Sequence, residues 1–155
     1  MNITIKKKAL LYDIENIAYV IADNGVAGHS PHRVFDICRK GNIDRVARIL
    51  GLAYAKVQYV LSPLLEVPPM FRDFDFSVIP RNYRFRFKCG LPAEKILKIK
   101  ETVHEYMVCM VLADWLGITM PAEAKVWEER AAVCLKELAG SSIISGVMTR
   151  QVPPI

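Results

Sequence analysis

Apolar residues recur at helical spacing through most of the chain. The first set predicts an amphipathic helix over residues 7–23, and its members are Leu10, Ile14, Ile17 and Ile21. Asn24 and Gly25 come next and favour the left-handed turn that ends a helix. A short helix is then expected over residues 32–40, before Gly41.

A long helix is predicted to run from Asn42 to Pro63. The Asn42 side chain is expected to cap it by accepting a first-turn N–H, and Asp44 suits the positive end of the helix dipole. Gly51 costs about 1 kcal/mol relative to alanine inside a helix, which indicates a close crossing with another helix. The apolar series of this helix is Val46, Ile49, Leu50, Ala53, Val57, Val60 and Leu61.

Between residues 64 and 90 the period changes to two. A helix is excluded by Pro63, just before this segment, and by Pro68, Pro69 and Pro80 within it. Alternation at residues 74–78 and 83–88 predicts a β-hairpin at about 73–89, with its turn at residues 80–82. One side of the hairpin is aromatic and must pack on the helices or on another subunit, because a lone hairpin is marginally stable. The other side can set Asp75 opposite arginines.

Two further helices are predicted in the second half. Pro92 opens a helix over residues 93–116, of which residues 106–113 are apolar on all sides, as at the centre of a bundle or in an interface. The last helix starts at Pro121 and is expected to end at Gly140; its apolar stripe is Ala124, Trp127, Ala131, Leu135 and Leu138. Residues 141–155 are predicted to form an extended arm that docks through Ile143, Ile144, Val147 and Arg150.

These patterns predict a mainly α fold. A chain of 155 residues suits one domain, here a four- to five-helix bundle with one β-hairpin over residues 1–140, followed by the extended C-terminal arm. The expected core comprises Leu10, Ile14, Ile17, Val46, Ile49, Val57, Val103, Met107, Val111, Trp115, Trp127 and Leu135.

The composition of the chain indicates that the protein binds a partner. With 52% hydrophobic residues and a mean hydropathy of +0.20, the chain has more apolar material than a small monomer needs. The net charge of +5 comes from residues 81–100, which hold seven basic residues and one acidic residue, against 14 and 15 elsewhere. Such a patch faces a polyanion or an acidic protein surface, unless it is only a solvated face.

The alternation in this segment assigns its residues to two sides. We expect Tyr83, Phe85 and Phe87 to anchor the strand, and the cations Arg81, Arg84, Arg86 and Lys88 to face a partner or DNA. Interleaved aromatics and cations can also stack bases and contact phosphates. The pleat, however, sends the two kinds of side chain to opposite faces, which favours an inward aromatic side.

No motif supports an enzyme, a metal site or a cofactor. His29 and His32 lack a third ligand at suitable spacing, and His104 with Cys109 or Cys38 lacks an orienting acid. The four cysteines, which include Cys89 and Cys134, contain no C-x-x-C pair and are expected to be thiols, three of them buried. Phosphate-binding glycine loops are absent.

Neither a secretory signal nor a membrane span is expected. The N-terminal lysines precede acidic residues with no small-residue cleavage site. The longest apolar stretch, residues 106–113, is far below the roughly 18 residues that a membrane-spanning helix needs.

Residues 104–140 carry a family resemblance. An apolar helix ending in A-D-W-L, then I-T-x-P, then a helix with A-x-x-W and A-x-x-x-L resembles the head-to-tail connector (adaptor, neck) proteins of tailed bacteriophages and prophages. The matching residues are Ala113, Asp114, Trp115, Leu116, Ile118, Thr119, Pro121, Trp127 and Leu135. The likeness covers about a quarter of the chain, and the arm is poorer in arginine than expected of the family.

The resemblance implies a non-enzymatic structural protein of the virion, assembled in the bacterial cytoplasm. It implies a homo-oligomeric ring of about a dozen copies between the portal and tail proteins, around a DNA passage. A small basic nucleic-acid-binding helical domain, acting as a monomer or dimer, is the alternative, and a small enzyme ranks third.

Overall fold

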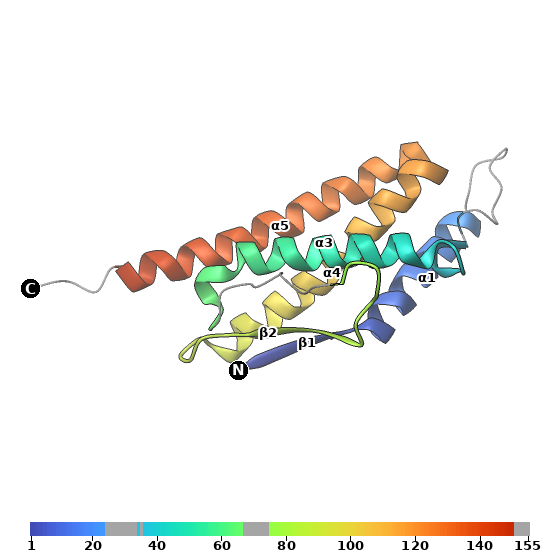
Figure 1. Ribbon diagram of the computed structural model, residues 1–155. Helices are drawn as coiled ribbons and strands as arrows, with labels where there is room; N and C mark the ends of the chain where they lie inside the picture. The colour runs from blue at the N-terminus through green and yellow to red at the C-terminus, as the bar shows by residue number, and fades with distance from the viewer. Residues whose placement is uncertain (24–33, 35, 67–74, 151–155) are drawn as a thin grey trace, which may run out of the picture.

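The computed structural model describes residues 1–23, 34, 36–66 and 75–150, with side chains to Ser142. In chain order the elements are β1 (Asn2–Lys6), α1 (Lys7–Asp23), the 3-10 turn η1 (Asp36–Cys38), α3 (Ile43–Val60), the 3-10 turn η2 (Ser62–Leu64), β2 (Asn82–Arg86), α4 (Ala93–Thr119) and α5 (Pro121–Arg150). Figure 1 shows the helices gathered into a bundle, with the two strands side by side along it. The mainly helical fold predicted from the sequence is confirmed.

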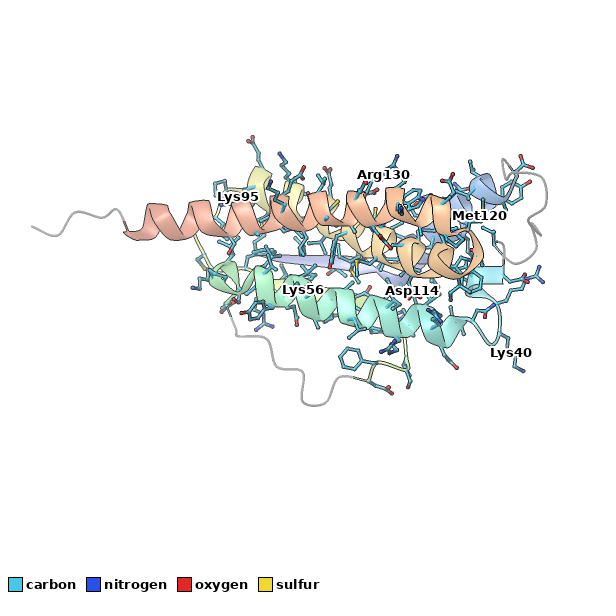
Figure 2. All side chains as sticks on the ribbon, turned by 90° about the horizontal axis from the view of Figure 1, so that it is seen from above. Lys40, Lys56, Lys95, Asp114, Met120 and Arg130 are labelled. Carbon is cyan, nitrogen blue, oxygen red and sulfur yellow. The ribbon has the colours of Figure 1, made fainter. Side chains whose placement is uncertain are left out.

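Helix α4 is the central helix of this bundle. It packs against α5, α3 and α1, and also contacts β1. Residues 106–109 and 111–113 are buried and Met110 is partly buried, so the stretch predicted to be apolar on all sides is almost fully enclosed. Figure 2 places Met120, in the turn between α4 and α5, and Lys40 at one end of the molecule, with Lys95 toward the other.

A single core joins the helices to the sheet. Of the predicted core residues, Ile17, Ile49 and Leu135 are half-buried and pack against the core, while the remaining predicted members are buried. Gly51 is also buried. Each strand contributes its apolar side: Ile3 and Ile5 from β1, with Tyr83 and Phe85 from β2.

The sheet is a two-stranded antiparallel pair, but the partner of β2 differs from the prediction. β2 pairs with β1, so that Ile3 lies opposite Phe85 and Thr4 opposite Arg84. Residues 76–77, assigned to the first strand of the hairpin, form a turn in which Asp75 accepts hydrogen bonds from the Ser77 N–H (2.9 Å) and hydroxyl (2.5 Å). Asp75 therefore does not face the arginines, and residues 73–74 lie outside the described residues.

Two local predictions at the start of α3 are corrected. The Asn42 side chain does not cap the helix; its Nδ2 instead donates to the Asp36 carbonyl, 2.8 Å away, and ties η1 to the start of α3. Only residues 34 and 36–40 of the short helix predicted over 32–40 are described, and they contain the 3-10 turn η1. Gly41 adopts a φ of +99°, a left-handed conformation that favours glycine.

The C-terminal segment is helical beyond Gly140, which corrects the predicted end of the last helix. α5 continues to Arg150, and the Lys95 Nζ donates to the Ser141 carbonyl at 3.2 Å. Leu138 and Ser142 are buried. Figure 1 shows the end of α5 reaching past the other elements, so the predicted arm is present as a helix, and residues 151–155 lie outside the described part.

Candidate functional site: a cationic face and a lysine groove

β2 presents aromatic side chains to the core and cations to solvent. Tyr83, Phe85 and Phe87 are each 1% exposed, whereas Arg84 and Arg86 between them are exposed. Successive side chains of a strand point to opposite faces of a sheet, and the run at 83–87 follows that rule. The inward aromatic and outward cationic assignment made from the sequence is thus present in the structure.

The buried aromatic side is held by α3. The Tyr54 ring packs edge-on against Tyr83 and Phe85, with ring centroids 4.9 and 5.2 Å apart. Its hydroxyl donates to the Arg84 carbonyl at 2.8 Å. Burial raises the pKa of the Tyr54 phenol. Tyr54 therefore fixes the strand both by packing and by a hydrogen bond.

We define the cationic face as the exposed side chains of Arg84, Arg86 and Lys88. They lie on the side of the sheet opposite the core, and β1 adds Asn2 and Thr4 beside them because Asn2 pairs with Arg86 and Thr4 with Arg84. In the part of the chain that the structure describes, none of these three cations forms an ion pair. Their charges are available to an outside partner.

A groove continues this positive surface around the start of α1. It has a volume of about 1070 Å³ and is lined by the charged residues Lys6, Lys7, Lys8, Glu15 and Arg81, with Leu11, Tyr12, Ile79 and Asn82. The Lys7 N–H donates to the Arg81 carbonyl at 3.0 Å, which holds the two segments together. We call it the lysine groove.

The lysine groove was not predicted from the sequence. The sequence pattern predicts a partner-facing Arg81, but it gives the N-terminal lysines no place beside that residue. Their convergence depends on the pairing of β1 with β2, which brings Lys6 opposite Asn82. The available signal was the alternation of Ile3 and Ile5 with polar residues at the start of the chain.

The remaining predicted interface residues lie beyond the described side chains. Ile143, Ile144, Val147 and Arg150 belong to the last turns of α5, where only the helical backbone is described. Their predicted docking role stays a prediction.

The structure does not bring the candidate metal ligands together among the described residues. His29 and His32 lie outside the described residues. Among the described residues, no group of three or more histidine, cysteine, aspartate or glutamate side chains is placed to hold a metal ion.

His104 contacts an acid from another helix. Its Nε2 lies 2.6 Å from Asp13 Oδ2, an α1–α4 contact that the sequence did not predict. The Cys109 thiol instead donates to Glu105 Oε1 at 3.6 Å. Burial, with a smaller effect of Glu105, raises the pKa of Cys109 to about 12, so this thiol is not activated as a nucleophile.

The residues that carry the family resemblance make structural contacts. Asp114 accepts two hydrogen bonds from the Arg45 guanidinium of α3, at 2.6 and 3.1 Å (Asp114 is labelled in Figure 2). The Trp115 indole donates to the Val34 carbonyl at 3.1 Å. Trp127 is buried, with Arg130 lying over its ring at 4.7 Å. The motif stabilises the packing of α4 with its neighbours.

No helix in the described part of the chain has the length and apolar character needed to span a membrane. The chain matches no protein-family model, no curated protein and no solved structure.

Proposed function

We propose that this protein is a non-catalytic assembly subunit of the head-to-tail connector type, working as one copy in a homo-oligomeric ring. The observation that carries the proposal is the cationic face: Arg84, Arg86 and Lys88 are exposed and unpaired within the described chain. A concentrated set of free cations on a rigid sheet gives long-range attraction to acidic proteins or to DNA. In a connector, the portal, the tail and the DNA passage supply such neighbours.

The projecting end of α5 supports an assembly role. The end of α5 reaches past the other elements of its own bundle (Figure 1), and a neighbouring copy offers it a surface. Repetition of one such contact around a closed ring satisfies every subunit equally.

Exposed apolar residues on α5 give further support. Val126 and Val133 are exposed on this helix, and their spacing of seven places them on one helical face. These two valines, with the charged residues Glu129 and Arg130 between them, suit a contact of mixed apolar and polar character between helices of adjacent subunits.

Particle size and shape test the proposal. Multi-angle light scattering over a range of protein concentrations, followed by negative-stain electron microscopy, is expected to show closed rings of about a dozen copies. The same measurements are made on the protein co-expressed with the proposed portal or tail partners. A strictly monomeric protein in both settings would contradict the proposal.

A second candidate function, nucleic-acid binding by a monomer or dimer, is favoured by the same cations. It predicts a DNA complex whose affinity falls steeply as salt increases, since bound Lys and Arg release counterions from phosphates. Salt-sensitive DNA binding by a protein that stays monomeric at all concentrations would select this candidate over the connector.

A further inference from the structure

The lysine groove gathers four cations that form no ion pair within the described part of the chain. Lys6, Lys8 and Arg81 are exposed and Lys7 is half-exposed. Glu15 is the one carboxylate in its lining, so the groove keeps a positive excess.

The start of α1 makes this arrangement electrostatically unfavourable in the isolated chain. The N-terminus of a helix carries a partial positive charge, and anionic residues stabilise it. α1 instead begins with Lys7 and Lys8, directly after Lys6, and has no acidic residue in its first turn. A bound anionic group relieves the repulsion that the sequence builds into this position, and such local conflicts are expected at functional sites.

The lining of the groove also has an apolar part. Ile79 is buried and Leu11 half-buried, while Tyr12 is 66% exposed beside them. A sugar-phosphate backbone gains little from aliphatic side chains, whereas a protein segment places a large apolar residue on them. Interfaces between proteins combine such an apolar centre with a charged rim. Glu15 would repel a continuous polyanion, but it tolerates a peptide whose carboxylates lie near the lysines.

We propose that the lysine groove is the docking site for an acidic segment of a partner protein, in which one or two large apolar side chains lie between carboxylates. The apolar side chains pack on Tyr12, Leu11 and Ile79. The carboxylates pair with Lys6, Lys7, Lys8 and Arg81 at the rim. The volume of about 1070 Å³ accommodates several side chains of such a segment.

This inference rests on the proposed function only in taking the partner to be a protein. Peptide binding is measured on the full chain in any oligomeric state. A failure of the peptide to bind and a failure of the protein to form rings are therefore separate results.

Three labelled peptides probe the groove by fluorescence anisotropy. The first is Asp-Glu-Phe-Trp-Glu-Asp, the second its amide form Asn-Gln-Phe-Trp-Gln-Asn, and the third its polar form Asp-Glu-Ser-Gly-Glu-Asp. We expect the first peptide to bind at least about tenfold more tightly than either other peptide, since each lacks one of the two recognised features. A single-stranded thymidine oligonucleotide of about 16 nucleotides is the nucleic-acid probe.

Matched variants locate the binding. Lys7→Gln with Lys8→Gln is expected to weaken binding of the first peptide about tenfold. The control, Lys56→Gln with Lys125→Gln, removes two exposed charges outside the groove and is expected to leave the affinity of this peptide unchanged. Lys56 lies on α3 (Figure 2). Tyr12→Ala is likewise expected to weaken binding of the first peptide about tenfold. Its control is Tyr59→Ala, at a tyrosine of similar exposure (71%) outside the groove.

Three results would overturn the inference. The first is an absence of binding by the acidic apolar peptide, and the second is equal weakening by the groove and control variants. The third is tighter binding of the oligonucleotide than of the peptide, with loss in the Lys7 and Lys8 variant, which assigns the groove to nucleic acid. Circular dichroism of each variant checks that the fold is retained.

Discussion

Neighbouring residues of β2 have opposite roles. The Phe85 ring is enclosed between the strands and α3, while the Arg84 and Arg86 side chains on either side reach solvent. Substitutions at adjacent positions of β2 therefore affect either the core or the proposed interaction surface. Substitutions along this strand separate stability from binding.

Phe85→Ala is expected to lower the free energy of unfolding by about 3–5 kcal/mol, because it removes a buried ring and leaves a cavity. Chemical denaturation followed by circular dichroism measures the change. Arg84→Ala is the adjacent control and should stay within about 0.5 kcal/mol of the parent protein. If Phe85→Ala unfolded at the parent midpoint but lost only association, the aromatic side would be an interface.

The four cysteines should differ in reactivity. Cys89 is exposed and Cys109 is buried, and burial raises the pKa of Cys109 and of Cys38 to about 12. At pH 8 these two remain thiols, and the thiolate is the reactive form. We expect iodoacetamide at pH 8 to label Cys89 first, as read by peptide mass spectrometry, and Cys89→Ser to remove this fast phase. Rapid labelling of Cys109 in the folded protein would contradict its described burial.

At the scale of elements, α5 shows how tertiary contacts override a local stop signal. Gly140 followed by serines is typical of a helix end, yet the chain stays helical there, with Lys95 bonded to the Ser141 carbonyl and Ser142 buried. Gly140 does not have the positive φ that a terminating glycine adopts, and a Cβ atom added to it would meet no neighbouring atom.

Gly140→Ala should therefore stabilise the protein by about 0.5–1 kcal/mol, since alanine has the lower entropy cost in a helix and meets no neighbouring atom. Differential scanning calorimetry would record a higher Tm. Gly41→Ala provides the opposite case, because its φ of +99° strains any side chain, and a lower Tm is expected. A lower Tm for Gly140→Ala would instead indicate that the helix ends at Gly140, as the sequence predicts.

The elements were largely predictable because their signals are local. The helical periods fixed α1 at the bounds later observed, Lys7–Asp23, and the alternation at residues 83–87 gave β2 and its two sides. β1 was missed although Ile3 and Ile5 alternate with polar residues, since the segment is short and its partner lies far along the chain. Such a pairing follows from the global fold, and the local pattern at residues 74–78 competed with it.

At the scale of the whole molecule, the positive surface is a product of topology. The sequence concentrates charge in residues 81–100, and this part of the surface was predictable. The lysine groove was not, because Lys6–Lys8 and Arg81 come together only through the β1–β2 pair. Its apolar lining combines Tyr12 of α1 with Ile79, which no sequence window contains.

Charge reversal tests the cationic face in the assembled state. Arg84→Glu with Arg86→Glu is expected to abolish ring formation or partner binding, with little change in Tm, because both side chains are exposed. Light scattering and electron microscopy report assembly, and Lys40→Glu with Lys56→Glu, at two exposed lysines outside the proposed interfaces, is the charge-matched control. If the variant with both charges reversed assembled as well as the parent protein, the cationic face would not be required for assembly.

The β1–β2 pair also sets the order in which the protein can be built. β1 leaves the ribosome before its hydrogen-bonding partner, which is translated only after α1, α3 and the segment up to Asn82. Until then Ile3 and Ile5 have no strand to pair with, and forming this contact closes a long loop of chain, which slows folding. The sheet on which Ile3 and Ile5 of β1 depend can therefore form only after β2 has been made.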